Sequence, residues 1–202
     1  LSRYFGVLPA DATKDQVYKS VVMSVRDIML EKRLKFHKEM KAKRAKRVYY
    51  LCMEFLLGRS LKNSIFNLGI EASVSGALKK YGVTLEELYE LEPDAGLGNG
   101  GLGRGNYPAM GFSIRYEYGL FKQKIVDGWQ IELPDVWLPG GESWLTQRSD
   151  KIFTVHFDGY VEERWSNDRM EVIYHDGNDV EAIAYDMMVS GYDSEAVSVL
   201  RL

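Results

Sequence analysis

Residues 47–55, with the sequence RVYYLCMEF, are the stretch that indicates how this chain folds. The stretch is short, rich in aromatic and β-branched residues, and almost continuously apolar. Strands with this composition are usually buried on both faces, as the strands of a parallel sheet are. We therefore expect a buried and parallel strand here.

The segment before this strand reads as a long helix. Thr13 and Gln16 form a capping box, in which the two residues satisfy free N–H groups at a helix start. Apolar residues then recur at three- and four-residue spacing, which predicts one apolar face made of Val17, Val21, Val25 and Ile28.

The segment after the strand also has helical character. Residues 59–80 look helical with interruptions at Gly69 and Gly76, and Gly82 can end the helix. A second capping box at residues 84–87 predicts a further short helix. Together with the strand, these helices indicate the α/β class.

The second half of the chain carries a pattern of strands separated by Asp-Gly pairs. Glycine adopts positive φ without steric cost, so an Asp-Gly pair between two apolar runs is typical of a β-hairpin turn. We expect three such hairpins, in which residues 113–126 and 129–133, 152–157 and 160–165, and 170–175 and 179–185 flank Asp127-Gly128, Asp158-Gly159 and Asp176-Gly177.

A glycine-rich loop lies between these halves, and five of its eight residues from 96 to 103 are glycine. Gly96, Gly98 and Gly101 match G-x-G-x-x-G, but a dinucleotide site needs a strand directly before the motif. The preceding residues, LEELYELEPDA, are acidic and helical, and no Gly-Lys-Ser/Thr of a P-loop follows. Composition leaves two interpretations open: a nest of backbone N–H groups that binds an anion, or a tight turn between helix and sheet.

Charge and cysteine content exclude several other classes. The chain has 26 basic and 29 acidic side chains, which gives no electrostatic reason to expect nucleic acid as a partner. The basic run at residues 41–47 could hold anions, but a solvated helix end is the favoured interpretation. Cys52 is the only cysteine, so an internal disulfide is excluded and a reducing compartment is indicated. Its apolar surroundings in the sequence predict a buried thiol.

No segment of the sequence indicates a membrane or a metal. No apolar run reaches the roughly 18 residues needed to span a bilayer, and the N-terminus lacks the pattern of a signal peptide. His37, His156 and His175 lie in separate segments without metal-ligand or triad spacing. We expect a cytoplasmic protein without a metal site.

Three blocks of the sequence carry a family resemblance. Residues 92–104, EPDAGLGNGGLGR, resemble the glycine loop of α-glucan phosphorylases, the family of the glycogen, starch and maltodextrin enzymes. Residues 48–69 and 114–138 resemble the blocks before and after that loop, and YDMMVSGYD at 185–193 follows the pattern in which the domain continues. Leu56 is similar to the bacterial-type members at that position.

The resemblance implies a fold and a place in a larger enzyme. It implies a fragment of the N-terminal, Rossmann-like domain of a two-domain GT-B type glycosyltransferase. Residues 1–104 would be its helical and buried-strand part, and residues 105–202 its β-rich part. The C-terminal cofactor-binding domain would be absent from this chain.

The resemblance also implies a reaction: phosphorolysis of an α-1,4-glucan by inorganic phosphate, giving glucose 1-phosphate with retention of configuration. The family carries pyridoxal 5′-phosphate as a Schiff base and forms homodimers; the cofactor lysine and the catalytic residues would come from later sequence. Backbone N–H groups of the glycine loop bind phosphate and sugar in the family, a role that falls here on Asn99, Gly100, Gly101 and Leu102. Glu54 matches an acidic residue near the glucose site, although pairing with Arg59 explains a buried carboxylate equally well.

Two other functions are compatible with parts of the sequence. A nucleotide-sugar glucan synthase could use a similar glycine loop, but the blocks around Glu54 and Trp129 argue against it. A non-catalytic carbohydrate-binding fragment could stack sugars on its aromatic residues, although hairpin spacing favours packing for most of them. Those residues are Tyr116, Tyr118, Trp129, Trp137 and Trp144.

The join after Arg104 departs from the family pattern. There the loop leads into an apolar helix of roughly three turns, whereas here GNYPAMGF follows directly, and Gly105 and Pro108 are poor helix formers. We expect that the sequence omits residues of the natural polypeptide. Mass spectrometry of the intact protein should give more than the 23.1 kDa of these 202 residues. A mass of 23.1 kDa would point instead to a deletion.

The isolated 202-residue chain should show no phosphorolysis, because the cofactor lysine and the cationic phosphate clamp of the family belong to later sequence. Purified chain incubated with glycogen and phosphate should release no glucose 1-phosphate in a coupled assay. Release above the level of a protein-free control would contradict this expectation.

Overall fold

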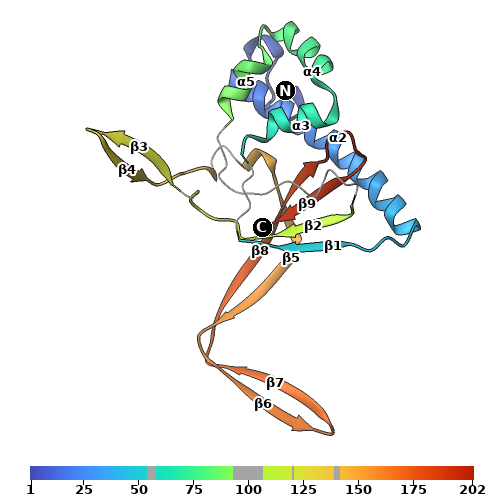
Figure 1. Ribbon diagram of the computed structural model, residues 1–202, viewed down its shortest axis with the longest axis vertical. Coiled ribbons are helices and arrows are strands. Elements are labelled where there is room, and N and C mark those ends of the chain that lie inside the picture. The colour runs from blue at the N-terminus through green and yellow to red at the C-terminus, as the bar shows by residue number, and fades with distance from the viewer. Residues whose placement is uncertain (54–57, 93–106, 120, 139–141) are drawn as a thin grey trace. The chain divides into compact units, whose positions relative to one another are not determined.

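The structure is a computed structural model that describes residues 1–53, 58–92, 107–119, 121–138 and 142–202. Contacts divide the chain into two compact units. The first unit contains residues 1–146 and 186–202, and the second contains residues 147–185. The chain is a mixed α/β structure, as the sequence predicts (Figure 1).

Helices make up most of the N-terminal half. They are α1 Ser2–Phe5, η1 Pro9–Asp11, α2 Lys14–Ala42, α3 Ser60–Leu68, α4 Glu71–Leu78, η2 Lys79–Tyr81 and α5 Leu85–Leu91, with η4 Glu142–Trp144 later in the chain. Both predicted capping boxes are confirmed: Thr13 with Gln16 begins α2, and Thr84 with Glu87 begins α5. None of the described helices is both long and apolar enough to cross a membrane.

The buried face of α2 differs from the predicted one. Val17 and Val25 are buried, but Val21 is half-buried and Ile28 is 42% exposed. The face that packs is shifted around the helix, because α3, α5 and η4 contact α2 there. Its buried residues recur every three or four positions, as Tyr18, Val22, Val25 and Met29. The core that they form with α3 and α5 includes Leu61, Ile65, Leu85 and Leu88.

Glycines end two helices at positions that the sequence predicts. Gly69 caps α3 and Gly82 caps η2, each in the left-handed conformation that glycine adopts without steric cost. The predicted interruption at Gly76 is wrong, since this residue lies inside α4. A single glycine costs a helix only about 1 kcal/mol, so neighbouring contacts can maintain the helix through it.

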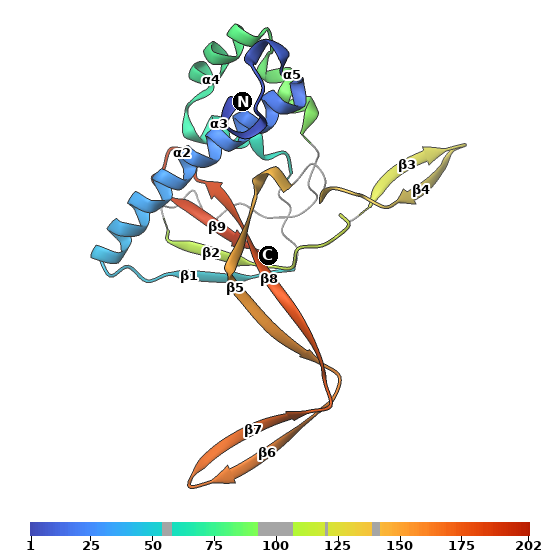
Figure 2. The same ribbon diagram turned by 180° about the vertical axis from the view of Figure 1, so that it is seen from behind.

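A five-stranded sheet has the strand order β1-β2-β9-β8-β5. Its strands are β1 Val48–Leu51, β2 Ala109–Phe112, β9 Val197–Arg201, β8 Asn178–Ser190 and β5 Leu145–Phe157. β1 with β2 and β2 with β9 are parallel, and β9 with β8 is antiparallel. In both views the helices lie above β1, β2 and β9 (Figures 1 and 2). β2 is a strand that the sequence pattern did not reveal.

The predicted parallel strand within residues 47–55 is confirmed, but the prediction that this strand is buried is wrong. β1 is parallel to β2, but its four side chains are all exposed, from 40% at Val48 to 82% at Leu51. Among the described strands, β1 stands at the end of the sheet and pairs with β2 alone. Apolar composition therefore does not distinguish an edge strand from a central one. Cys52, predicted to be buried, is half-buried.

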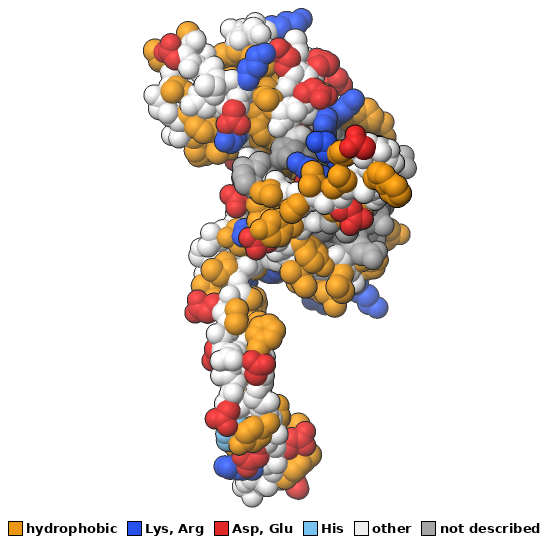
Figure 3. All heavy atoms as spheres, turned by 90° about the vertical axis from the view of Figure 1, so that its left-hand side faces the viewer, with side chains coloured by type: hydrophobic (Ala, Val, Ile, Leu, Met, Phe, Trp, Pro, Cys, Tyr) orange, Lys and Arg blue, Asp and Glu red, His pale blue; other side chains and the backbone are white. Residues whose placement is uncertain are grey.

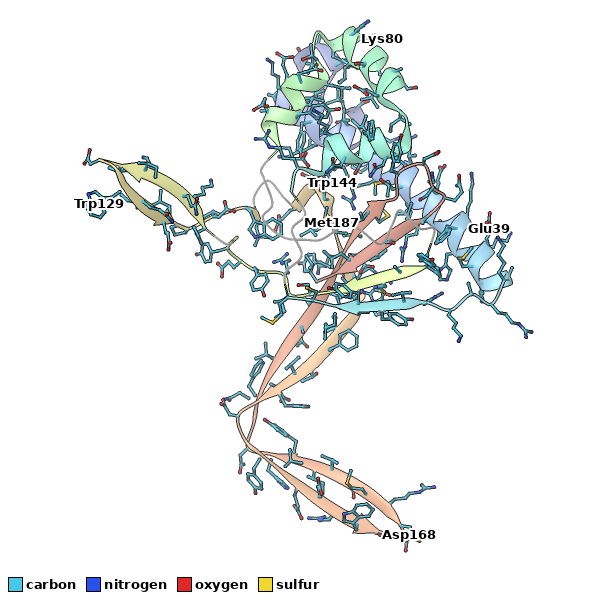
Figure 4. The ribbon with its side chains drawn as sticks, in the orientation of Figure 1. Glu39, Lys80, Trp129, Trp144, Asp168 and Met187 are labelled. Carbon is cyan, nitrogen blue, oxygen red and sulfur yellow. The ribbon has the colours of Figure 1, made fainter. Side chains whose placement is uncertain are left out.

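The Asp127-Gly128 hairpin is confirmed, but its first strand begins at Lys122 and not at residue 113. β3 Lys122–Val126 pairs with β4 Trp129–Leu133, and both turn residues have positive φ, 50° and 81°. Directly opposite residues share a face of an antiparallel pair, so Val126, Trp129 and Ile131 lie on one face. Trp129 is 78% exposed at the tip of the hairpin (Figure 4). Figure 3, seen from the side on which this hairpin lies in Figure 1, shows hydrophobic side chains at the surface.

The other two predicted hairpins are wrong. β6 Tyr160–Ser166 pairs with β7 Arg169–His175 rather than with β5. The turn between them is Asn167-Asp168, whose φ angles are both positive, 51° and 58°. β5 and β8 are neighbours outside that pair. The second unit is thus a long two-stranded ribbon in which Asp158-Gly159 and Asp176-Gly177 form opposite corners.

The two corners contact each other across the ribbon. The Asn178 side chain donates a hydrogen bond of 2.9 Å to Asp158 Oδ2, and Tyr174 Oη donates to the Asp158 carbonyl oxygen. Gly159 has a φ of 68°, and a Cβ there would collide with the His175 carbonyl oxygen and the Gly177 nitrogen. Glycine at position 159 is therefore required by both conformation and space.

Gly159→Ala should lower the free energy of unfolding of the protein more than Gly128→Ala does. Both glycines have positive φ, which costs an L-residue about 1 kcal/mol, but a Cβ on Gly128 meets no atom within 4 Å. Comparison of the two purified variants by urea denaturation should show the larger loss for Gly159→Ala. Equal losses would show that backbone conformation alone demands this glycine.

Candidate functional site

The residues that the sequence assigns to ligand binding are Asn99, Gly100, Gly101, Leu102 and Glu54, and all of them lie outside the described residues. Leu56 also lies outside. The structure does describe residues that adjoin these segments, namely Met53, Gly58, Glu92 and Tyr107. The geometry of these neighbours defines the candidate site.

The segment that leads to Glu54 leaves the carboxyl end of a parallel strand. The Cys52 backbone N–H donates to the Phe112 carbonyl oxygen at 3.1 Å, which extends the pairing of β1 with β2. Tyr116 Oη lies 3.5 Å from the Met53 carbonyl oxygen. The carboxyl ends of parallel strands meet at one edge of a sheet, and ligands of open α/β sheets bind at that edge.

Glu92, the residue directly before the glycine-rich segment, holds the start of α3. It is 3% exposed. Its Oε1 accepts hydrogen bonds from the Ser60 backbone N–H at 2.9 Å and from Trp144 Nε1 at 2.7 Å. Its Oε2 accepts from the Leu61 backbone N–H at 2.9 Å. We call Ser60, Leu61, Glu92 and Trp144 the Glu92 cluster.

The local sequence explains why α3 needs this carboxylate. The residue at its N-cap position, Arg59, makes no side-chain hydrogen bond to the helix start. The first N–H groups of a helix have no partner within the helix, and burial without a partner is costly. Glu92 follows α5 in an extended conformation, with φ of −74° and ψ of 122°, and its carboxylate replaces the missing cap.

The electrostatics of the cluster reflect its burial. Burial raises the pKa of Glu92, while the hydrogen bonds from Leu61, Ser60 and Trp144 act in the opposite direction. Burial, followed by the charge of Glu92, also raises the pKa of Tyr18 well above its usual range. The partial positive charge of the α3 N-terminus favours the ionised carboxylate. This helix start is thus already occupied by a carboxyl group of the protein.

Contacts from α2 fix the position of Trp144. Arg26 Nη1 donates to the Ser143 carbonyl oxygen at 2.8 Å, and Arg26 Nη2 donates to Thr146 Oγ1. These contacts hold the residues on both sides of Trp144, which is 5% exposed and lies within the body of the molecule (Figure 4). Trp144 therefore reaches Glu92 from a well-anchored backbone.

The aromatic residues considered for sugar stacking divide into two groups. Trp137 and Trp144 are buried, and their indole N–H groups donate to the Tyr116 carbonyl oxygen and to Glu92. These two residues pack, but neither lies in a hairpin, and Tyr116 is half-buried. The prediction that hairpin spacing favours packing is wrong for Trp129 of β4. Tyr118 and Trp129 are 52% and 78% exposed.

The other charged candidates have structural explanations. Residues 41–47 are exposed along their whole length, at the end of α2 and in the turn after it. Arg59, proposed as a partner of Glu54, forms an ion pair of 3.5 Å with Glu90.

The histidines also have partners within the protein. His156 lies beside Asp179, with 2.5 Å between Nδ1 and Oδ1, and His175 Nε2 lies 2.9 Å from Glu162 Oε2. In the described part of the chain, no three His, Cys, Asp or Glu residues are grouped as metal ligands would be.

Sequence reasoning missed the roles of Glu92 and Ser60, and it considered Trp144 only for sugar stacking or packing. Glu92 follows several other acidic residues at the end of α5, and nothing in a single sequence shows which of them is buried. The available signal was negative: Arg59 is a poor N-cap residue for a helix that starts at Ser60. That absence predicts an unidentified partner from elsewhere in the chain.

Sequence comparisons with known proteins identify one family. A sequence model of carbohydrate phosphorylases matches residues 78–202. Glycogen phosphorylase of Haemophilus influenzae is 40% identical across 98% of this chain and 25% of that protein. Glycogen phosphorylase of Bacillus subtilis is 38% identical across 95% of this chain and 25% of that protein. The human liver form is 40% identical, with 95% and 23% covered.

The chain thus spans about a quarter of the length of these relatives. The match includes the glycine-rich segment, Glu92 and Trp144, and it extends through β9. The family resemblance of the sequence blocks is therefore confirmed. This chain belongs to the carbohydrate phosphorylase family.

Proposed function

We propose that this chain is part of the N-terminal catalytic domain of an α-1,4-glucan phosphorylase. The whole protein would transfer a terminal glucosyl unit to inorganic phosphate and give glucose 1-phosphate with retained configuration. The observation that carries this proposal is the identity of about 40% across nearly the whole chain with proteins named glycogen phosphorylase in bacteria and in humans.

In this proposal the glycine-rich segment binds the anionic and sugar groups of the substrates. The backbone N–H groups of Asn99, Gly100, Gly101 and Leu102 would donate to the phosphate and to the sugar, and Glu54 would lie at the glucose. Dense donors are needed wherever two phosphate groups must come close, because like charges repel. The parallel order of β1, β2 and β9 supports this role, since Met53 at the carboxyl end of β1 directly precedes Glu54.

The architecture proposed for the whole protein is a two-domain, GT-B type glycosyltransferase with a Rossmann-like N-terminal domain. The parallel strands and the helices above them are compatible with that domain (Figure 2). We further propose a cytoplasmic homodimer that acts on α-glucan and binds no nucleic acid. The near balance of basic and acidic side chains supports the last point.

The family is pyridoxal phosphate dependent, and we propose the same for the whole protein. A lysine that forms a Schiff base is activated by burial or by neighbouring cations. None of the lysines in the described ranges is buried. These residues do not fit a covalent cofactor site, so we place that site outside them and assign no step of the reaction through the cofactor to this chain.

The decisive test is the product of the full-length protein that carries this sequence. With maltodextrin and inorganic phosphate it should form glucose 1-phosphate, identified by phosphorus NMR as the α anomer. Formation of the β anomer would contradict retention, and absence of the product in a correctly folded protein would contradict the proposed function.

A glycine-to-alanine pair tests the role of the loop. Gly101→Ala should raise the KM for phosphate by about tenfold or more, because a Cβ obstructs the close approach of a ligand to the backbone N–H groups and displaces them. Gly76→Ala is the matched control, since this glycine lies inside α4 and a Cβ there meets no atom within 4 Å. If both variants keep the kinetic constants of the unchanged enzyme, the loop does not bind phosphate, although the proposed reaction still stands.

A further inference from the structure

A pocket of about 940 Å³ lies where α2, α3, α4 and the connection between β8 and β9 meet, and the proposed function does not use it. Its lining comes from Lys32 of α2, from several residues between 66 and 75, and from residues 192–195 before β9. In both views the β8–β9 connection lies beside α2 (Figures 1 and 2). Sites for small ligands have volumes of about 300 to 1,000 Å³, so this pocket is large enough to hold one.

The end of α3 forms one wall of the pocket. Gly69 caps this helix with a φ of 67°, and α4 begins two residues later at Glu71. Phe66 and Asn67 therefore lie in the last turn of α3. Asn67 Nδ2 donates a hydrogen bond of 3.0 Å to the Ser190 carbonyl oxygen at the end of β8, which ties this wall to the other one.

The connection between β8 and β9 forms the other wall. The Gly191 N–H donates to the Ala196 carbonyl oxygen at 3.0 Å, which closes the connection over residues 192–195. Asp193 has a φ of 45°, a left-handed conformation that aspartate adopts more readily than most residues. Lys32 Nζ lies 3.9 Å from Glu195 Oε1 and links the connection to α2. Both walls thus have a defined backbone before any ligand binds.

Phe66 and Tyr192 place aromatic surface on this pocket. Their rings are stacked, with centroids 5.1 Å apart and planes 9° from parallel. Stacking covers only part of each ring, because Phe66 is still 59% exposed and Tyr192 is 46% exposed. Each ring limits the movement of the other, so the uncovered ring surface has a fixed orientation. The pair is a preformed apolar surface within a pocket whose other lining is mostly polar.

The charged side chains of the lining disfavour two classes of ligand. Glu71, Asp193 and Glu195 contribute carboxylates, and Lys32 contributes an ammonium group. The excess of negative charge repels phosphate groups and nucleotides. Organic cations are typically held in cages of several aromatic rings, whereas the two rings here stack on each other, and Lys32 repels a cation as well. A neutral ligand is therefore favoured.

A chain of glucosyl units is a neutral ligand with the required chemistry. The C–H face of a glucosyl ring can stack on the open surface of Phe66 or Tyr192. Its hydroxyl groups can donate to Glu71 and Asp193 and accept from Lys32, since a hydroxyl is both a donor and an acceptor. Ligand sites typically combine aromatic surface with a few polar groups in this way.

We propose that this pocket holds a stretch of the α-glucan other than the terminal unit that reacts. Residues 192–195 directly precede β9, so the pocket lies at the amino end of a strand that is parallel to β2, as β1 is. The candidate site adjoins the carboxyl ends of these strands, at the opposite edge of the sheet. The inference rests on the proposed phosphorylase function, which supplies the glucan, and it adds a second place of attachment. A polymer reaches both places at once and gains avidity, whereas a short oligosaccharide reaches only one.

The test uses the full-length protein with Tyr192→Ala and a matched control, Tyr81→Ala. Tyr81 lies in η2, is 41% exposed and does not line the pocket. Tyr192→Ala should raise the KM for glycogen by about three- to tenfold, the effect of losing one aromatic contact. Its kcat and its KM for phosphate and for maltopentaose should stay within about twofold of the unchanged enzyme, because these values do not depend on the second place of attachment. Tyr81→Ala should leave all of them unchanged.

A direct measurement of binding does not need catalysis. In affinity electrophoresis through gels that contain glycogen, Tyr192→Ala and Phe66→Ala should each be retarded less than the unchanged enzyme, while Tyr192→Phe, which keeps the ring, should be retarded normally. The two alanine variants combined should weaken binding by less than the product of their single effects, because the rings act as one pair. Phe66→Ala keeps the test decisive if Tyr192→Ala does not fold.

Two results would overturn the proposal. One is an unchanged KM for glycogen in folded Tyr192→Ala and Phe66→Ala enzymes. The other is an equal increase of the KM for glycogen and for maltopentaose, which would show general damage instead of the loss of a second attachment. A wild-type protein that forms no glucose 1-phosphate would overturn the proposed function, and its retardation by glycogen would still test the pocket. The two failures are therefore distinguishable.

Discussion

A carboxylate at the start of a helix is the contact on which the described structure most depends. Glu92 satisfies the first N–H groups of α3, and the same oxygen accepts the indole N–H of Trp144. Because α3 lacks a side-chain cap of its own, this long-range contact replaces a local one. The end of α5, the start of α3 and η4 therefore occupy fixed positions relative to one another.

The edge of the sheet, unlike the Glu92 contact, is not buried. It carries apolar side chains that none of the described residues cover. All four residues of β1 are exposed, and so are Trp129 and Ile125 of the β3–β4 hairpin. Unpaired strand edges with apolar side chains readily bind other protein segments. The composition of residues 47–55 is that of a covered strand, and the sheet as described does not cover it.

Local signals in the sequence predicted local structure well. Both capping boxes, the glycine caps at 69 and 82, and the Asp127-Gly128 turn are each determined by a few neighbouring residues. Two local signals failed, because Gly76 lies inside α4 and the Asp-Gly pairs at 158 and 176 form corners of the ribbon instead of hairpin turns. The other wrong predictions required knowledge of a distant partner. Burial of β1 depends on strand order, and exposure of Ile28 depends on which helices pack on α2. Glu92 escaped prediction for the same reason, because its partners lie 31 to 52 positions away. The roles of Asn99 and Glu54 stay predictions, because those residues are outside the described ranges.

The long two-stranded ribbon also has a consequence for the order in which it folds. Asn167-Asp168 is a two-residue turn, so β6 and β7 can pair with little loss of chain entropy. Once that pair exists, the corners at Asp158-Gly159 and Asp176-Gly177 lie opposite each other, and β5 meets β8 without closing another long loop. The strands of the ribbon can therefore pair progressively from the turn towards the open end within microseconds, the timescale of hairpin formation. The β8–β9 pair is also local, because residues 191–196 join its strands, whereas the parallel pairs β1–β2 and β2–β9 have the highest contact order and form last.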